Sequence, residues 1–405
     1  MPLERAVLPV PGPRQLLADS GGVYVANAAV AFLFSCTGPV AIILSVAAGA
    51  GLSEGDIASW IFGGFFLNSF ITIAFSLAYR QPLVFLWSIP GSVLLGPALG
   101  HLGFAEVVGA FLATGVLMLL LGLSGWVRRA MEAVPMPIVM AMVAGVFLRF
   151  GIGLVHSFRD DLALASFMTA AWLAFTAVPR LGRIVPPLIA ALVVGVIVMM
   201  AEKTFKPTGG ALLAIVSPHF YAPRFSWNAM VELVAPLAIT VLTVQNAQGI
   251  AILTAAGHKP PTNAITAACG VGAFVTGLFG AVSTCLTGPV NAVITSAGEK
   301  SRHYTAALVV AALAMMFGLL APLFTRLLLA TPPAFIAALA GLAMLRVLQT
   351  AFQISFRDRF SFGALTCFLV TVADLPIFHI GAPFWGLVFG LAVSWLLERK
   401  DLERK

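Results

Sequence analysis

Two short segments of this chain could bind an anion, and they lie far apart in the sequence. The first is Trp87–Ser92 (WSIPGS) and the second is Ser283–Asn291 (STCLTGPVN). Each joins a brief β-prone run to a proline that suits the first turn of a helix, where its missing N–H costs nothing. The free amides at such a helix start carry about half a positive charge. Two of these helix starts pointing at each other predict an anion site that needs no Lys or Arg.

The alternative interpretation is that these prolines and glycines only kink membrane helices, in which both residues are common. Paired interruptions at corresponding positions of two chain halves are, however, the sequence feature that best indicates the binding site of a transporter. We therefore interpret the two breaks as a binding site.

A run of amide side chains predicts a further polar group near this site. Thr240–Gln248 (TVLTVQNAQ) places Gln245, Asn246 and Gln248 within a long apolar segment. Gln245 and Gln248 share one helix face, and we predict that Gln245 faces the ligand. The alternative is that these amides only hold helices together, which is worth about 0.6 kcal/mol each. Phe34–Pro39 (FSCTGP) is a third break, within the first apolar segment.

The ionisable residues form no catalytic or metal-binding pattern. Glu106, Glu232 and Asp374 lie near the expected outer ends of helices, where their side chains can reach water. The histidines expected in solvated loops are His156, His258, His303 and His379. Because the sequence has no zinc-protease, P-loop or nucleophile-elbow motif, we expect no enzyme, no cofactor, no metal and no direct coupling to ATP.

The elements that must position these residues are membrane helices. The chain is 60% hydrophobic and 10% charged, whereas a soluble chain is about a quarter charged. Apolar runs of about 20 residues, enough to cross a bilayer, recur from Tyr24 onward. We predict an all-α polytopic membrane protein with fourteen transmembrane segments. Segments 3 and 10 are short strand-plus-half-helix elements that cross near the midplane. The basic residues lie singly in loops, so the pI near 9.6 does not indicate nucleic-acid binding.

Both termini are predicted to be cytoplasmic. This orientation leaves few basic residues outside, as the positive-inside rule requires; they are Arg149, Arg159, Lys203, Lys206, Arg224 and Arg326. Internal matches at one offset, such as Pro137 with Pro333 and Gly145 with Gly341, indicate a duplication. Seven segments per unit is an odd number, so the second copy enters the membrane upside down. The result is a seven-plus-seven inverted repeat.

The paired elements, above all Thr287–Ala292 (TGPVNA), and this layout resemble the benzoate/proton symporter family. That family belongs to the wider group of nucleobase–cation symporters and sulfate permeases, and the resemblance covers essentially the whole chain. It implies a core domain and a gate domain, the gate often forming the dimer contact. The implied ranges are 1–22 for a cytoplasmic lead, 23–129 and 228–327 for the core, 130–200 and 328–398 for the gate, 201–227 for an extracytoplasmic loop and 399–405 for a cytoplasmic tail.

In nucleobase relatives, acidic residues on segments 8 and 10 hold the ligand. The matching positions here carry Gln245 and Thr287–Asn291 without a carboxylate. That difference favours an anionic substrate and leaves the proton carrier unidentified. We expect import of benzoate or a similar aromatic carboxylate with protons, by alternating access across an inner membrane, in a homodimer formed through the gate domain. The alternatives are a nucleobase or inorganic-anion permease of the same fold, and a non-coupled channel or membrane scaffold.

The expected substrate-binding residues follow from this hypothesis. Backbone amides and hydroxyls of the two helix starts hold the carboxylate, aromatic side chains pack on the ring, and the remaining groups lie beside them. The set comprises Phe32, Phe34, Ser35, Trp87, Ser88, Gly91, Ser92, Gln245, Asn246, Thr287, Gly288 and Asn291.

Overall fold

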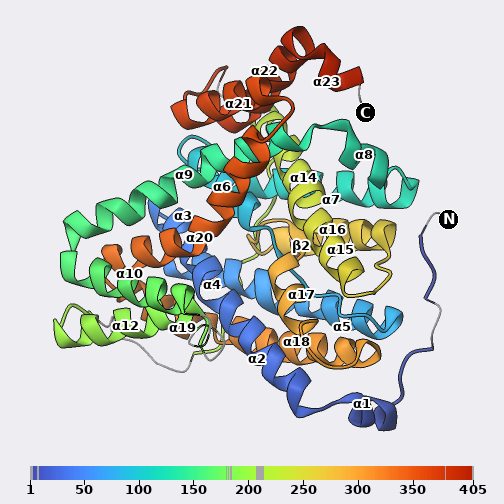
Figure 1. The fold of residues 1–405 in the computed structure, drawn as a ribbon, viewed down its shortest axis with the longest axis vertical. Coiled ribbons are helices and arrows are strands. Elements are labelled where there is room, and N and C mark those ends of the chain that lie inside the picture. Colours follow the sequence, from blue (N-terminus) through green and yellow to red (C-terminus); the bar gives the residue numbers. More distant parts are fainter. Residues whose placement is uncertain are drawn as a thin grey trace.

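The computed structural model describes residues 3–6, 9–178, 180, 182, 185–206, 214–378 and 380–403. Within these ranges the chain is almost wholly helical (Figure 1). His379, which we expected in a solvated loop, lies outside the described residues.

The helices and strands of the first half precede a long extended connection. They are α1 (Pro13–Asp19), α2 (Gly22–Cys36), α3 (Gly38–Gly49), α4 (Glu54–Ile61), η1 (Phe62–Leu67), α5 (Asn68–Tyr79), β1 (Phe85–Trp87), α6 (Ile89–Ala98), α7 (Phe104–Ser124), α8 (Val127–Ala133), α9 (Met136–Asp160), α10 (Leu162–Ala177) and α12 (Pro187–Ala201).

The elements of the second half follow that connection. They are α13 (Trp227–Ala229), η2 (Met230–Val234), α14 (Ala235–Ile239), η3 (Thr240–Asn246), α15 (Ala247–Ala255), α16 (Thr262–Gly277), β2 (Thr284–Leu286), α17 (Gly288–Ile294), η4 (Lys300–Arg302), α18 (His303–Leu319), α19 (Ala321–Leu329), α20 (Pro333–Phe356), α21 (Ser361–Ala373), α22 (Ala382–Leu397) and α23 (Arg399–Glu403).

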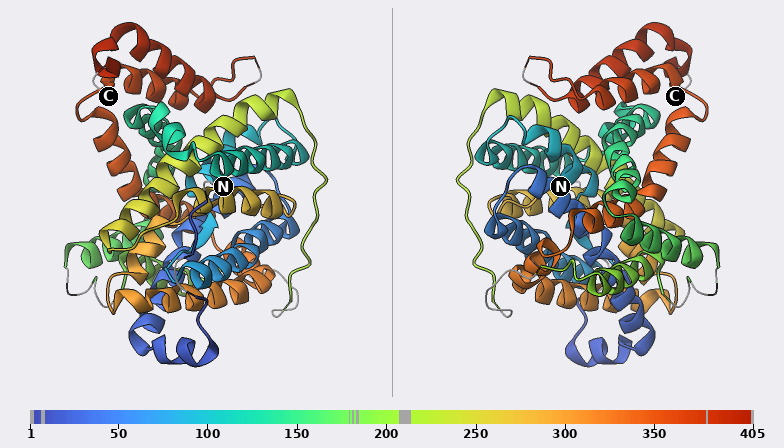
Figure 2. Two further views of the ribbon diagram at one scale, coloured as in Figure 1. Left: turned by 90° about the vertical axis from the view of Figure 1, so that its right-hand side faces the viewer. Right: turned by 90° about the vertical axis from the view of Figure 1, so that its left-hand side faces the viewer.

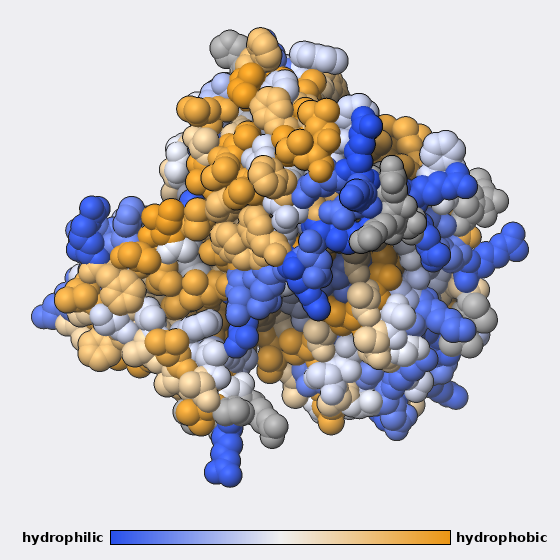
Figure 3. Space-filling model, turned by 45° about the horizontal axis from the view of Figure 1, so that its top comes forward, coloured by the Kyte–Doolittle hydropathy of each residue, from blue (hydrophilic) through white to orange (hydrophobic). Residues whose placement is uncertain are grey.

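Length and composition make this a polytopic membrane protein. Among the described residues, seven helices are long and apolar enough to cross a membrane, and five shorter apolar helices accompany them. Large apolar side chains such as Leu120, Ile197 and Leu369 are exposed, and Figure 3 shows a broad apolar area on one face. Exposed apolar surface of this extent is typical of a surface that contacts another apolar phase. The count of fourteen crossings and the inverted repeat stay predictions.

The two breaks form the expected strand-plus-half-helix elements, and their strands pair. β1 leads into α6 and β2 leads into α17, with Pro90 and Pro289 in the first turns. The strands are antiparallel, and Trp87 lies opposite Thr284. Local sequence explains these elements, because each proline presets the helical φ without sacrificing a hydrogen bond. The antiparallel pairing places the two helix starts at opposite ends of the short ladder.

Other helices are also interrupted. The first apolar segment breaks at Thr37, where α2 ends and α3 begins with Gly38 and Pro39, as its sequence predicted. Three π-helical turns, η1, η2 and η3, lie within longer helices. Two of them, η2 with Glu232 and η3 with Gln245, belong to the single apolar span Trp227–Ala255. Turns of this kind inside an α-helix often occur at functional sites.

The helices pack in two groups, and the paired strands lie in one of them, against α5, α16, η1 and η3. α9 packs along α20 and α21, and α10 packs along α12, while α7 packs along α16, and α18 packs against α2 and η1. Figure 1 shows α9, α10 and α12 on one side of the molecule and α21 and α22 at its top. Figure 2 shows the extended connection before α13 running along the outside of the helices.

Candidate functional site

Side chains of neighbouring helices satisfy the edges of the two buried strands. The Phe85 N–H donates to Oγ1 of Thr72 on α5 at 2.9 Å, and the Leu83 N–H donates to Oγ of Ser76 at 3.3 Å. On the other strand, the Thr284 hydroxyl donates to Oδ1 of Asn68 at 2.7 Å. An unpaired amide at membrane depth costs several kcal/mol, so these buried polar residues on α5 hold the strands in place.

Two asparagines complete the ladder in corresponding ways. Asn291 on α17 accepts the Val84 N–H at 3.2 Å, and Asn246 on η3 accepts the Leu286 N–H at 2.8 Å, each through Oδ1. Both side chains are buried. The Asn246 amide nitrogen also lies 3.5 Å from the Cys269 sulfur, so both ends of this carboxamide are already engaged. Asn246 therefore supports β2, although we expected it among the substrate-binding residues.

The start of α6 uses most of its own polar groups. The Gly91 N–H donates to the Ser88 Oγ at 3.1 Å, which is a helix N-cap. The Ser92 N–H and hydroxyl both donate to the Ser88 carbonyl, at 2.9 and 3.1 Å. A ligand that used the predicted Gly91 and Ser92 amides would have to replace these bonds.

Three buried donors at the ladder have no hydrogen-bond partner among the described residues. They are the Trp87 indole Nε1, the Ser283 Oγ and the Asn291 Nδ2, and all three side chains are at most 3% exposed. Leaving such a group unpaired costs about 1–3 kcal/mol, and each calls for an explanation. Their shared property is that each can donate a hydrogen bond to an electron-rich ligand.

Aromatic rings adjoin one of these donors, the Trp87 indole. Phe65 packs on Trp87 with ring centroids 4.5 Å apart, Phe317 lies 4.6 Å from Phe65, and Phe32 meets Phe317 edge-on at 5.9 Å. Gly64 permits this approach, because a Cβ there would lie 3.2 Å from the Trp87 ring. We call Phe32, Phe65, Trp87 and Phe317 the aromatic cluster. Sequence reasoning identified Phe32 and Trp87, but Phe65 and Phe317 come from elements that only the fold brings together.

The segment with the amides faces the start of α17. The Gln245 side chain is buried and makes no hydrogen bond to the described residues. Gln248 lies over Gly288, where an added Cβ would come within 2.7 Å of its Oε1. The Thr287 hydroxyl does not cap α17, so it is free for another partner. Gln248 was not among the predicted binding residues, although its helical spacing from Gln245 indicated a shared face.

The first break contributes less directly. The Ser35 hydroxyl donates to the Ala31 carbonyl at 3.0 Å, and the Phe34 carbonyl accepts the Thr37 hydroxyl at 3.0 Å. Both polar groups are engaged within the break. Phe34 is partly buried, and it does not belong to the aromatic cluster.

Several ionisable residues lie elsewhere than the sequence suggested. Glu232 is buried and His101 Nε2 lies 2.9 Å from its Oε2, so the expectation that Glu232 reaches water was wrong. The expectation of solvated loops was also wrong for His258 and His303, which are buried with ring nitrogens 3.2 Å apart. Arg149 lies within α9 because that helix continues to Asp160, and its guanidinium donates to the Val93 carbonyl on α6.

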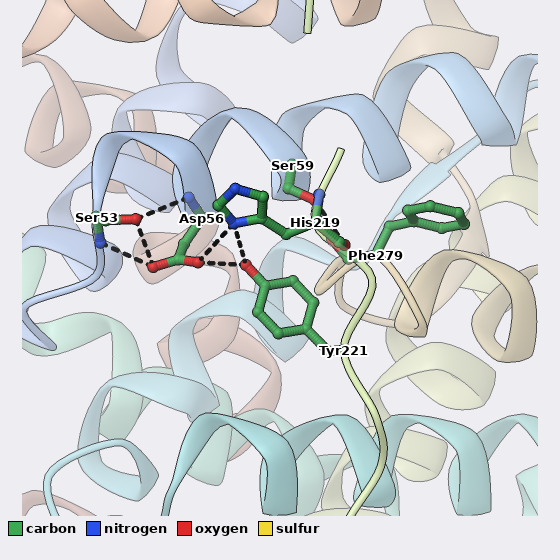
Figure 4. Close-up of polar contacts among 6 residues, drawn as sticks. All are labelled: Ser53, Asp56, Ser59, His219, Tyr221 and Phe279. Atoms are coloured by element: carbon green, nitrogen blue, oxygen red, sulfur yellow. Dashed lines mark hydrogen bonds and ion pairs between the residues drawn. The ribbon is translucent and has the colours of Figure 1, made fainter. Parts of the chain in front are cut away.

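The connection between the halves is anchored by a polar network (Figure 4). Asp56 on α4 accepts the Tyr221 hydroxyl and lies 3.3 Å from His219 Nδ1. The Ser59 hydroxyl donates to the Phe279 carbonyl at 2.9 Å and accepts the His219 N–H at 3.0 Å. Burial and the hydrogen bond to Asp56 raise the pKa of Tyr221 well above its ordinary value. Tyr221 therefore stays a neutral donor that fixes the connection to α4.

A metal-dependent role has no support in the described ranges. Across them, no group of three or more His, Cys, Asp or Glu side chains is placed to hold a metal ion.

The helices, the paired broken elements and the unpartnered donors define a membrane transporter, and solved structures of transporters share the fold. The overall structure of SLC26A9 has a TM-score of 0.64 at 15% identity, covering 95% of this chain and 67% of that one. The transmembrane domain of the cyanobacterial bicarbonate transporter BicA has a TM-score of 0.57 at 17% identity, covering 91% of this chain and 97% of that one. At these identities the likeness shows the fold alone.

Sequence comparisons identify the family. The model of the BenE family, described as benzoate membrane transport protein, matches residues 19–396. The chain is 31% identical to the inner membrane protein YdcO of Escherichia coli (strain K12), over 89% of this chain and 92% of that protein. It is 27% identical to the benzoate membrane transport protein of Acinetobacter baylyi (strain ATCC 33305 / BD413 / ADP1), over 91% and 93%. The chain belongs to the benzoate membrane transport protein family.

Proposed function

We propose that this transporter imports benzoate or a similar small aromatic carboxylate together with protons. The observation that carries the proposal is the set of three unpartnered donors along the ladder, on Trp87, Ser283 and Asn291, together with the aromatic cluster to which the Trp87 ring belongs. A carboxylate accepts N–H and O–H groups in short, strong hydrogen bonds, and an aromatic ring packs favourably on aromatic side chains. The site holds the anion with neutral donors, so the substrate can also leave.

Further groups support this placement. The Thr287 hydroxyl at the start of α17 and the Gln245 amide on η3, which packs against β2, supply two more neutral donors. Sulfate or bicarbonate would gain nothing from the apolar faces of Phe65 and Phe317, so the aromatic cluster favours an aromatic substrate over an inorganic anion. The printed name of the Acinetobacter baylyi relative points the same way.

We propose that the protein works by alternating access. We propose that the helices of the predicted gate, in which α9 packs on α20 and α21, stay together while the core with the paired strands moves against them. The protein would lie in an inner membrane with both termini cytoplasmic. The homodimer through the gate domain stays a prediction.

The experiment is a binding panel on the purified protein, using calorimetry with benzoate, uracil, sulfate and bicarbonate. We expect benzoate to bind and the other three not to compete with it. Tighter binding of uracil or of an inorganic anion than of benzoate would contradict the proposal. A Phe65→Ala variant should lose benzoate binding selectively, because it removes a face of the aromatic cluster.

A further inference from the structure

Glu232 is a buried carboxylate that the substrate site does not use. It lies in the π-helical turn η2 and is only 5% exposed. A carboxylate buried within a membrane span is costly, and such residues commonly carry ions or protons. Because η2 contacts α6, α7 and α22, Glu232 lies where the predicted core meets the predicted gate.

Its two oxygens have partners on opposite sides of that boundary. Oε2 lies 2.9 Å from Nε2 of His101, in the connection between α6 and α7. Oε1 lies against the backbone of Gly381, where an added Cβ would overlap it. Gly381 is the N-cap of α22, so the carboxylate lies at the positive end of a gate helix. The ionised form of Glu232 thus links the core to the gate.

Few other charges act on this carboxylate. Asp374, at the end of α21, repels it, and Arg149 on α9 interacts with Asp374. α6 and α22 contain no ionisable residue, and Glu106 at the start of α7 bonds instead to the Gly103 N–H at 2.9 Å. Residue 379 lies outside the described residues. His101 is therefore the one direct titratable partner of Glu232 in the described chain, and its side chain is 31% exposed.

We propose that Glu232 is the proton-binding group of this transporter, loaded through His101, and that its protonation releases α22. A proton from water binds the exposed imidazole of His101 and passes to Oε2, which converts the carboxylate to a neutral carboxylic acid. The neutral acid is attracted less to the start of α22. The core then moves against the gate, and the proton leaves when the group faces the other side.

The same helix joins this group to the substrate site. Glu232 and Gln245 both belong to the span Trp227–Ala255, about 20 Å apart at 1.5 Å per residue. Substrate bound beside η3 and a proton bound on η2 therefore act on one moving element. This inference rests on the proposed function, because it assigns the proton of that symport.

The test compares Glu232→Gln with wild type and with the matched control Glu106→Gln, each in proteoliposomes. Glutamine imitates the protonated acid and keeps the size of the side chain beside Gly381. We expect Glu232→Gln to lose benzoate accumulation driven by a proton gradient but to keep benzoate counterflow without a gradient, while Glu106→Gln behaves like wild type. Gradient-driven accumulation in Glu232→Gln would overturn the assignment. So would equal loss of accumulation and counterflow, which would show a structural role.

A second readout separates this assignment from the transport proposal. Infrared difference spectra between acidic and neutral pH should show a carboxylic-acid band in wild type and in Glu106→Gln that is missing in Glu232→Gln. The band should appear whether or not benzoate is transported. If wild type fails to move benzoate but shows the band, the proposed function is wrong and the proton site stands. An unchanged band in Glu232→Gln overturns the proton site.

Discussion

Asn291 and Asn246 make the same backbone contact, and this symmetry separates a role in the fold from a role in binding. Each side chain is buried and accepts one strand amide, from Val84 and from Leu286 respectively. Replacing either by alanine leaves a buried N–H unsatisfied, at a cost of about 1–3 kcal/mol in the free energy of unfolding. Both variants should therefore melt at lower temperature than wild type.

Only Asn291 has an unpartnered Nδ2 to offer to a ligand. A hydrogen bond to a charged group is worth about 1.5–3 kcal/mol, which corresponds to a loss of roughly 10-fold to 150-fold in benzoate affinity. We expect Asn291→Ala to show this loss and Asn246→Ala to bind benzoate nearly as wild type. Calorimetry on both variants in the same detergent gives the dissociation constants, and melting curves give the stabilities. Equal benzoate affinity in wild type and Asn291→Ala would refute the placement of the carboxylate at the ladder.

Three further predictions concern charge, packing and pH. Gln245→Glu should weaken benzoate binding at neutral pH by about 2 kcal/mol, roughly 30-fold, if the two negative charges lie about 8 Å apart at an effective dielectric constant of about 20. The affinity of the variant should recover as pH falls toward about 5, because the new carboxylate is then protonated. If the variant binds benzoate as tightly as wild type at every pH, Gln245 lies away from the substrate. Gly381→Ala should lower the free energy of unfolding by about 1–3 kcal/mol, because the Cβ of the introduced alanine overlaps the Glu232 side chain. The same substitution should be nearly neutral in a Glu232→Ala background. An equal loss of stability in both backgrounds would contradict the contact between Gly381 and Glu232. Burial and the nearby charges of His303 and Lys300 lower the pKa of His258 to about 4. As pH falls from about 6.5 to about 4, the unfolded chain therefore binds a proton that the folded chain does not, and the folded state loses stability. The melting temperature should drop over this window less steeply in His258→Asn than in wild type, and parallel curves would show that His258 is not buried.

Local chemistry made the broken elements predictable. Pro90 and the Thr287–Pro289 turn act on their own backbone, so the sequence alone identified both strand-plus-half-helix elements, and the same holds for the break at Thr37. The aromatic character of Phe32 and Trp87, and the helical spacing of Gln245, were also visible in the sequence. Hydropathy indicated a polytopic membrane protein for the same reason, because composition over about 20 residues decides whether a helix can span a bilayer.

What the sequence could not supply depends on contacts between distant residues. We expected Glu232 to reach water because the sequence places it near a helix end. Its burial comes instead from packing against His101 and Gly381, which the sequence does not show. The contact of Asn246 with Leu286 was not predicted, because nothing local shows that Leu286 needs an acceptor there. Phe65 and Phe317 show no distinguishing pattern in their own segments, and only the fold packs Phe65 on Trp87 and Phe317 on Phe65. Arg149 was assigned to an outer end because the continuation of α9 to Asp160 had no clear local signal.

In the proposed function, a proton gradient drives an aromatic carboxylate through this protein. The most direct measurement is uptake of radiolabelled benzoate into proteoliposomes, with an inward proton gradient and with the gradient collapsed by a protonophore. We expect accumulation above the equilibrium level with the gradient, accompanied by alkalinisation of the outer medium, and only equilibration without it. Equal uptake in both conditions, or no benzoate uptake in either, would show that this protein does not couple benzoate to protons.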